Sequence, residues 1–393
     1  MLLHSITLSN LLSFKDTSLD LGALNVLIGP NGSGKSNLIE AISLLQAAPR
    51  DLGAVIRSGG GVREWIWKGE PATDKAAHLE CLLSPFKSPQ PVRYVLEFAE
   101  AGQALEITEE RLENEKPAPG EAGPYLYFAM QAGSGVVNVF RAQGAPRKRN
   151  LEHGEVAGSQ SVLSALRDLE QFPEITHYAK QFERIQFYRE WNMGRRGAPR
   201  LPQPADLSNA FLEENAANLA LVLNRMETEG SLPSVERYVG RFYEQFEGIT
   251  ASIQGGTVQL YLREKGLRQG VPATRLSDGT LRFLCLLAVL CHPNPPPLVC
   301  LEEPELGLHP DALSMVAQAL IEASERMQLV VTTHSEALID ALSDKPETVI
   351  VCERDAGGST RFRRLDAEQI KTWLEDYTLG QLWRKGEIGG VRW

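Results

Sequence analysis

The sequence predicts an α/β fold built around a mostly parallel sheet, and two observations support this prediction. Three apolar runs of strand length, at 298–303, 329–334 and 348–354, alternate with segments that have helical spacing. A short apolar run at 25–29 is followed by a glycine-rich loop and by a helical pattern at 36–48. Strands that alternate with helices are typical of a parallel sheet with helices packed on its faces.

The middle of the chain has a different character from its two ends. Proline, glycine and charged residues are frequent over 50–160 and separate strand-like runs at 93–98, 125–130 and 136–140. This pattern predicts an antiparallel β part with polar turns. Further along we expect helices at 161–182, 208–228 and 233–246, a strand at 185–188 and an edge strand at 257–264.

The composition limits the classes of protein that this chain can be. It has 393 residues, of which 43% are hydrophobic, so a large core can form and global disorder is not expected. The net charge of −10 is opposite in sign to that of a basic nucleic-acid-binding domain. Any DNA contact must therefore use a local basic patch. The five cysteines form no C-x-x-C pair, which gives no reason to expect a disulfide framework or a zinc site.

The sequence also suggests where the protein works. Its first residues lack a basic region followed by a long apolar stretch, and the longest apolar run, 283–290, is too short to cross a bilayer. We therefore expect a soluble, cytoplasmic protein without membrane contact.

Residues 29–36, with the sequence GPNGSGKS, form the first motif that carries chemistry. They fit the pattern G-x-x-x-x-G-K-[ST] between a predicted strand and a predicted helix, which is the context of a phosphate-binding P-loop. The loop glycines let backbone N–H groups face a phosphate, Lys35 can reach the β- and γ-phosphates, and the Ser36 hydroxyl can bind Mg²⁺. The predicted nucleotide-binding residues of this motif are Asn31, Gly32, Ser33, Gly34, Lys35, Ser36 and Asn37.

The second motif is a pair of carboxylates after a buried strand, in LVCLEEPE at 298–305. Open α/β sheets bind ligands at the carboxyl ends of their strands, which is where this pair lies. We expect Glu302 to hold Mg²⁺ directly or through water, and Glu303 to orient and polarise the attacking water of a phosphoryl transfer. The position on the Mg²⁺ side is more often Asp, so Glu302 is a departure from the usual pattern.

Two further motifs are ordinary when each is taken alone. LSDGTLR at 276–282 is by itself a turn or helix cap, and His334 in TTHSE is by itself a single histidine after a strand. Their order along the chain, after the P-loop and on either side of the paired carboxylates, gives them more meaning.

With this order of motifs the chain resembles ABC-type ATPases of the SMC, RecF and Rad50 kind. The segment 276–282 resembles the ABC signature, with Asp278 in place of its first glycine, and ELGLHP at 305–310 stands where this class has its D-loop. His334 resembles the switch histidine that contacts the γ-phosphate. The segments 187–207 and 377–393 resemble those of a narrower group, the bacterial predicted AAA/ABC ATPases of the AAA_21-like type.

The resemblance implies a mechanism as well as a fold. It implies ATP and Mg²⁺ as cofactors, and an ATP-dependent homodimer in which two chains close on two ATP molecules. Each ATP would contact the P-loop of one chain and Ser277 and Gly279 of the other. Lys35, Glu303 and His334 are then the expected catalytic residues.

The resemblance also implies an organisation into a P-loop NTPase head of the ABC type and an inserted arm. We expect 1–68 and 205–393 to form the head, the latter with the helical part, the signature, the carboxylate pair and the switch histidine. We expect 69–204 to be an α/β insertion in place of a coiled coil, because the chain has no heptad run long enough for one. Only 59 residues follow His334, too few for the TOPRIM nuclease domain of some relatives, so any nuclease is expected to be a separate chain. The Q-loop glutamine is left open among Gln131, Gln186 and Gln203, since Gln46 comes too early.

One basic segment deserves separate consideration, and we call residues 184–200 the arginine-rich segment. It contains five arginines with Phe187, Tyr188 and Trp191 among them, and Arg147, Lys148 and Arg149 form another basic cluster. Interleaved aromatic and Arg side chains can stack bases and follow phosphates. The alternatives are a solvated loop, or an Arg placed on the nucleotide of the same head.

Two functions follow from these expectations. The leading hypothesis is an ATP-driven switch that grips DNA or presents a surface to a nuclease-like effector protein. The resemblance implies that this switch acts in DNA repair or anti-phage defence. The alternative is a regulatory module in which ATP controls binding to a partner protein without DNA. Its docking surface would be the insertion together with Trp373, Trp383 and Trp393 near the C-terminal end.

Overall fold

The computed structural model describes residues 1–69, 76–131, 133–140, 147–151 and 154–390. Within it the chain forms two compact units. The first contains Met1–Ile185, Ile350–Arg364 and a short C-terminal piece from Gly389, and the second contains Gln186–Val349 and Leu365–Ile388. The division into a head and an arm at residues 69–204 stays a prediction.

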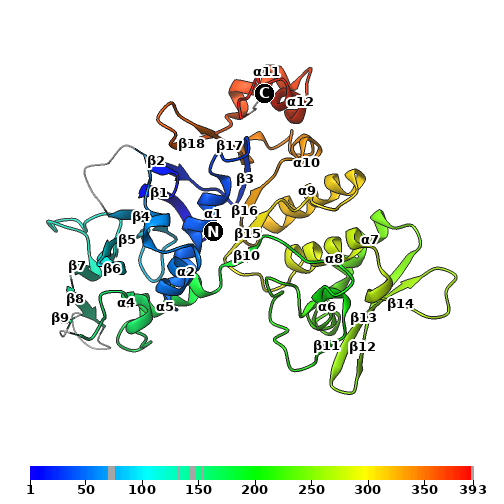
Figure 1. Cartoon of the computed structure of the whole chain (residues 1–393), viewed down its shortest axis with the longest axis horizontal. Helices are drawn as coiled ribbons and strands as arrows, with labels where there is room; N and C mark the ends of the chain where they lie inside the picture. Colours follow the sequence, from blue (N-terminus) through cyan, green and yellow to red (C-terminus); the bar gives the residue numbers. More distant parts are fainter. Residues whose placement is uncertain (70–75, 132, 141–146, 152–153, 391–393) are drawn as a thin grey trace. The chain divides into compact units, whose positions relative to one another are not determined.

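The first unit is built on an eight-stranded antiparallel sheet in the order β2-β1-β4-β5-β6-β7-β8-β9 (Figure 1). Alternation in the sequence explains these strands, since in β4 every second side chain from Ala77 to Leu83 is buried. The predicted antiparallel β part is therefore present. Its strands are β1 (Leu3–Leu11), β2 (Phe14–Asp20), β4 (Ala77–Leu83), β5 (Val92–Ala101), β6 (Ala104–Asn114), β7 (Leu126–Gln131), β8 (Ser134–Val139) and β9 (Arg147–Asn150).

The same unit contains the strand, loop and helix that hold the P-loop. Strand β3 (Leu24–Ile28) is completely buried and is followed after the loop by helix α1 (Lys35–Ala47). Strand β3 is next to β17 (Val349–Arg354), which pairs antiparallel with β18 (Thr360–Arg364). The other helices of the unit are α2 (Leu52–Ser58), α3 (Val62–Trp65), α4 (Val162–Ala165) and α5 (Pro173–Glu183).

A buried carboxylic acid joins the antiparallel sheet to helix α4. Glu110 on β6 is completely buried and accepts hydrogen bonds from the hydroxyls of Tyr94 and Ser161, at 2.9 and 2.6 Å, and from the backbone N–H of Val162 at 2.7 Å. Burial raises the pKa of Glu110 to about 7, although these three donors favour its charged form.

The second unit contains a parallel sheet with helices, as the alternating pattern predicts. Strands β10 (Gln186–Tyr188), β15 (Leu298–Glu302) and β16 (Gln328–Thr332) are parallel neighbours in that order. The helices near them are α8 (Asp278–Leu290), α9 (Pro310–Ser324) and α10 (Glu336–Asp340), and η3 (Pro346–Thr348) follows. Helix α8 is buried on all sides over 283–290, which explains its continuous apolar sequence.

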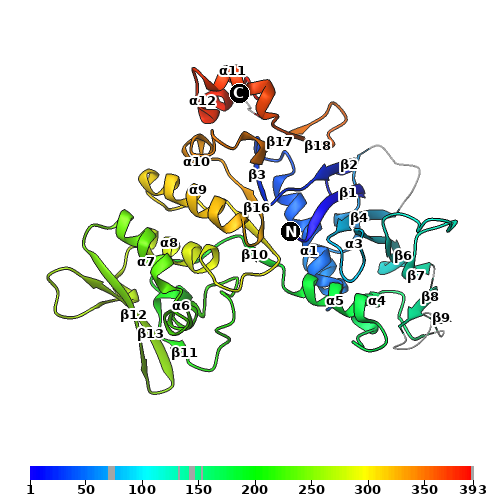
Figure 2. The ribbon, with the colours of Figure 1, turned by 180° about the vertical axis from the view of Figure 1, so that it is seen from behind.

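A smaller layer in this unit combines helices with a β-hairpin (Figure 2). Helices α6 (Leu219–Thr228) and α7 (Leu232–Phe242) pack against the hairpin of β12 (Phe246–Gln254) and β13 (Thr257–Glu264). The remaining elements are β11 (Gln203–Pro204), β14 (Val271–Pro272), η1 (Ala198–Arg200), η2 (Ala273–Arg275), α11 (Ala367–Leu374) and α12 (Leu379–Arg384).

Three local predictions from the sequence are wrong. The strand at 257–264 is not an edge strand, because β13 lies between β12 and the short β11. The helix predicted from 208 begins only at Leu219, because buried Asn218 donates to the carbonyls of Ser208 and Phe211 and so fixes a turn. The helix predicted over 161–182 is divided into α4 and α5, the second of which starts at Pro173.

The longest helix in the described part of the chain, α9, has 15 residues. None of the helices that the structure describes is both long and apolar enough to cross a membrane. All five cysteines are free thiols, and four of them are buried.

Candidate functional site

The P-loop lies against the ends of β17 and β18 within the first unit. Gly34 precedes α1 with φ of 105°, and a Cβ there would lie 2.1 Å from Thr360 Oγ1. A Cβ on Gly29 would lie 2.2 Å from the carbonyl oxygen of Cys352. The Thr360 hydroxyl also donates to the carbonyl of Ser33 at 2.7 Å. Glycine is therefore required at both positions for the loop to approach these strands so closely.

Lys35 is held inside this loop. Lys35 is only 6% exposed, and its Nζ donates to the carbonyls of Gly29 at 2.8 Å and Pro30 at 3.1 Å. Ser36 follows in the first turn of α1 and is exposed, as are Asn31 and Gly32 at the tip of the loop, whereas Ser33 is buried and Asn37 is partly exposed. The positive end of the helix and the ammonium group together make this loop suited to bind an anion.

The carboxylate pair lies at the carboxyl end of β15 in the second unit. Glu302 ends the strand, and its Oε1 is 3.4 Å from Nε of Arg189, which directly follows the neighbouring strand β10. Glu303 has φ of 46°, a left-handed conformation that is rare for a residue with a side chain. Its backbone N–H donates to the carbonyl of Thr332 at 2.9 Å, which anchors the strained residue to the end of β16.

His334 lies beside Glu303 at this edge of the sheet, with 3.9 Å between Nε2 and the Glu303 Oε1. A third carboxylate fixes this arrangement. Glu305 Oε1 accepts hydrogen bonds from the Thr333 hydroxyl at 2.7 Å and from the His334 N–H at 2.8 Å, and burial raises the pKa of Glu305. This role of Glu305 was not predicted from the sequence. The available signal was a further acid in LEEPE, two residues after Glu303.

The signature segment begins helix α8. Ser277 is the N-cap residue, and its Oγ accepts a hydrogen bond from the N–H of Thr280 at 3.0 Å. Gly279 faces the D-loop of the same chain, because a Cβ on Gly279 would lie 3.0 Å from the carbonyl oxygen of Gly307. Ser277 is exposed, so its side chain is accessible at the N-terminus of a 13-residue helix.

The structure corrects one interpretation of the arginine-rich segment. Phe187, Tyr188 and Trp191 are each less than 10% exposed and belong to the core, so they are not available to stack bases. Arg189 pairs with Glu302, and Arg200 is buried, whereas Arg195 and Arg196 are exposed. The sequence alone does not distinguish an aromatic residue in the core from an exposed one that stacks on bases, because both occur in the same sequence pattern.

Two of the glutamines considered for the Q-loop make structural hydrogen bonds. Gln46 Nε2 donates to the carbonyl of Ile185 at 2.6 Å, and Gln203 Oε1 accepts from the N–H of Ala220 at 2.8 Å. The Q-loop assignment stays open.

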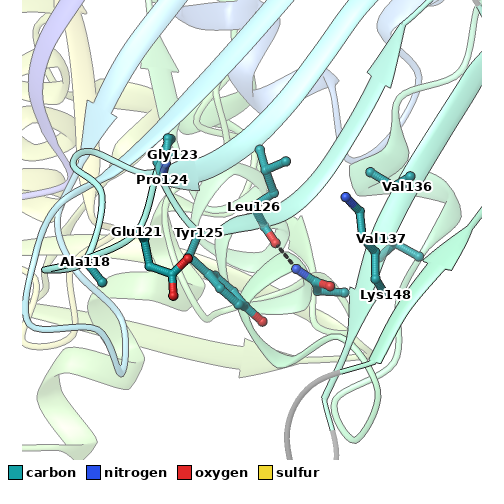
Figure 3. A pocket seen from close by; sticks show the side chains of 10 residues that line it. Ala118, Glu121, Gly123, Pro124, Tyr125, Leu126, Val136, Val137 and Lys148 are labelled. Atoms are coloured by element: carbon teal, nitrogen blue, oxygen red, sulfur yellow. Dashed lines mark hydrogen bonds between the residues drawn. The ribbon is translucent and has the colours of Figure 1, made fainter.

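A groove of about 420 Å³ lies in the first unit, between the loop before β7 and strands β7 to β9 (Figure 3). Its lining includes Glu121, Tyr125, Val137 and Lys148, and the Asn138 amide donates to the carbonyl of Leu126 across it. None of the motif residues lines this groove, so it is separate from the P-loop chemistry.

The two predicted Mg²⁺ ligands are hard oxygen donors of the kind that Mg²⁺ prefers. Ser36 in the first unit has an exposed hydroxyl, and Glu302 in the second unit has a partly exposed carboxylate. Among the described residues there is no cluster of three or more His, Cys, Asp or Glu side chains that could hold a metal by itself.

Comparison with solved structures shows the fold. The chain is similar to an SMC head bound to the C-winged helix domain of ScpA, with a TM-score of 0.54 and 12% identity over 94% of this chain and 99% of the other. It is equally similar to an SMC head domain with an extended coiled coil, bound to the C-terminal domain of ScpA derived from Pyrococcus furiosus. That TM-score is 0.54, with 14% identity over 95% of this chain and 98% of the other. The predicted P-loop NTPase fold of the ABC and SMC type is confirmed.

Comparison of sequences shows the family. The chain resembles a protein of Helicobacter pylori (strain ATCC 700392 / 26695) named ATP/GTP phosphatase, with 21% identity over 92% of this chain and 91% of the relative. Residues 24–340 match the family described as "AAA domain, putative AbiEii toxin, Type IV TA system", and the chain belongs to this family. The chain is thus an ATPase with the fold of an SMC head.

Proposed function

We propose that this ATPase is a switch that dimerises on ATP and reopens on hydrolysis. The observation that carries the proposal is the placement of Ser277 as the exposed N-cap of a long buried helix. An exposed hydroxyl at a helix N-terminus is accessible to the phosphate of a second molecule, which supports the proposal. The adjacent D-loop supports the same idea, because Leu306 is 48% exposed although it is a large apolar residue.

The roles of the individual residues follow from their chemistry. Lys35 neutralises phosphate charge, and Ser36 and Glu302 would hold Mg²⁺, which when bound supplies positive charge to the β- and γ-phosphates. Glu303 accepts a hydrogen bond from the attacking water and polarises it, and its Oε1 lies 3.9 Å from Nε2 of His334. His334 contacts the γ-phosphate, and Glu305 keeps its backbone in place.

Ser277 and Gly279 complete the site of the partner chain. Phosphoryl transfer needs charge and position more than covalent help, so a site divided between two chains makes hydrolysis depend on dimerisation. The closed dimer would then grip DNA or present a surface to a nuclease-like effector, in DNA repair or anti-phage defence. This biological role rests on the resemblance to SMC, RecF and Rad50 proteins.

A second candidate, an ATP-controlled module that binds a partner protein and no DNA, is favoured by helix α11. This helix has no buried residue, and Trp373 on it is 48% exposed. Exposed apolar side chains of this kind are typical of protein contacts. An SMC head of the same fold is bound to a domain of ScpA, which supports partner binding here. Trp393, the last tryptophan of the predicted docking surface, lies outside the described residues.

The two candidates differ in how they respond to salt and to two arginines. If the closed dimer grips DNA, replacing Arg195 and Arg196 by alanine is expected to weaken ATP-dependent DNA binding. The slope of log affinity against log salt should also fall by about two at most, since each lost phosphate contact releases about one counterion fewer. The measurement is fluorescence anisotropy of labelled DNA at several salt concentrations, with and without ATP.

The control for this experiment is Arg268→Ala, an exposed arginine in the turn between β13 and β14. For this variant, the slope of log affinity against log salt should equal that of the unchanged protein. An unchanged slope for the Arg195 and Arg196 double variant, with normal ATPase activity, would remove DNA contact from this segment and favour the partner-protein module.

A further inference from the structure

The arginine-rich segment ends in a buried guanidinium. Among the described residues, Arg200 and Lys35 are the lysine and arginine residues that are buried, and each is only 6% exposed. A buried charge is unfavourable unless its donors are satisfied. Lys35 belongs to the P-loop, so Arg200 is the buried cation that the proposed mechanism leaves without a role.

The hydrogen bonds of Arg200 converge on the signature turn. Its Nη1 donates to the carbonyls of Leu276 at 2.6 Å and Ala273 at 3.3 Å, and its Nη2 donates to the carboxylate of Asp278. Its Nε donates to the carbonyl of Met193 at 2.7 Å, which ties the guanidinium to its own segment. The fork geometry of Arg allows one side chain to hold these separate acceptors, which the single ammonium of a lysine could not do.

The acceptors lie on both sides of Ser277. Leu276 precedes it and Asp278 follows it, so the guanidinium fixes the backbone before and after the serine while the serine itself stays exposed. A second contact of the same kind lies one turn further along α8, where Arg282 Nη2 donates to the carbonyl of Trp191 at 3.1 Å. The segment from β10 to Arg200 therefore fastens the start of the signature helix.

The pairing also explains how the chain accommodates an acid in its signature. Asp278 occupies the position of the first glycine of the ABC pattern, and its side chain is 68% exposed. An exposed carboxylate beside Ser277 would repel the phosphates of a nucleotide. Its ion pair with Arg200 offsets this charge, and an acid in the first turn of a helix is itself favourable.

We propose that Arg200 is a positioning residue for the signature, and that Arg200 and Asp278 act as one coupled pair that takes the place of a signature glycine. The pair holds the turn 276–278 in the geometry in which Ser277 meets the nucleotide of the partner chain. This inference rests on the proposed function, because it requires the signature to contact ATP in a dimer. It also assigns part of the arginine-rich segment to ATP-driven dimerisation rather than to DNA.

The test compares Arg200→Met, Asp278→Asn and the double variant in the full chain. Each is checked for its melting temperature, its affinity for a non-hydrolysable ATP analogue as a monomer, and its ATP-dependent dimerisation. We expect Arg200→Met to weaken dimerisation and hydrolysis by about tenfold or more, because small errors of position are costly at such sites. Monomer ATP affinity should not change. Asp278→Asn alone should change dimerisation by less than about threefold, and the double variant should recover part of the loss, because the unpaired carboxylate is gone.

A second variant keeps the test decisive if Arg200→Met does not fold. Asp278→Lys changes an exposed residue and places a cation against Arg200. Attraction to phosphate alone would make this variant dimerise more tightly, whereas the positioning role predicts a loss of about tenfold or more. Arg237→Met, which removes an exposed arginine paired with Glu322 on α9, is the matched control and should dimerise normally.

The outcomes separate this inference from the proposed function. If Ser277→Arg still dimerises on ATP, the proposed composite site is wrong. If Ser277→Arg fails to dimerise while Asp278→Lys and a folded Arg200→Met dimerise and hydrolyse normally, the composite site stands and the positioning role of Arg200 is overturned.

Discussion

Replacing Lys35 by alanine is expected to abolish ATP hydrolysis, with a loss of at least about 10²- to 10³-fold, and to weaken ATP binding. The ammonium lies inside the P-loop at the start of α1, so its removal takes away the fixed positive charge that phosphate oxygens would meet. Phosphate release from saturating ATP gives the rate, and calorimetric titration with a non-hydrolysable analogue gives the affinity.

A matched control is Lys15→Ala, which removes an exposed lysine from β2 of the same unit. This variant should hydrolyse ATP at the normal rate. Normal turnover by the Lys35→Ala protein would show that the P-loop assignment is wrong.

Glu303→Gln is expected to bind ATP and to hydrolyse it about 10²-fold or more slowly, because the amide keeps the shape of the side chain and cannot accept a proton from water. The slow step should make the closed dimer accumulate. The backbone of Glu303 is strained at φ of 46°, and its side chain lies near His334. Glutamine has the same side-chain length, so it can take the same position. Single-turnover hydrolysis and analytical ultracentrifugation with ATP measure the two effects.

The neighbouring variant Glu302→Gln is the internal comparison. It is expected to lower the apparent affinity for Mg²⁺, which a magnesium titration of the ATPase rate would detect. If Glu302→Gln is slow at saturating Mg²⁺ while Glu303→Gln hydrolyses normally, the roles of the two carboxylates are exchanged.

The parallel strands were predictable because their signal is local. The apolar runs at 298–303 and 329–334 correspond to β15 and β16 within two residues at either end, since a strand buried on both faces needs apolar side chains at every position. The turn before α6 was not predictable in this way. It depends on buried Asn218, whose hydrogen bonds to Ser208 and Phe211 compete with a helix.

The position of β13 inside its sheet also depends on a distant part of the chain. Its second neighbour is β11, a pair of residues at Gln203–Pro204, and nothing in the alternation of β13 itself specifies that partner. Alternation predicts that one face of a strand is buried, and it does not predict which edges are paired.

The candidate site shows the same division between local and distant information. The residues from Gly29 to Ser36 form a motif whose neighbours in sequence are neighbours in space, so the sequence alone predicts them. Glu305 and Arg200 were missed because their partners are far away in sequence, Thr333 for the first and Asp278 for the second. Arg200 was counted with the other arginines of its segment as a possible nucleic-acid contact, although its guanidinium is buried.

The central claim is that ATP is shared between two chains, and one measurement tests it most directly. The dimerisation of Ser277→Arg is measured by analytical ultracentrifugation with ATP, in a chain that also carries Glu303→Gln so that hydrolysis does not reopen the dimer. Ser134→Arg, which places the same bulk on an exposed serine of β8, is the control. We expect Ser277→Arg to bind ATP with normal affinity because its P-loop is intact, and to remain a monomer while the control dimerises. If Ser277→Arg dimerises with ATP as the control does, the signature does not complete the partner's site, and the account of a shared ATP is contradicted.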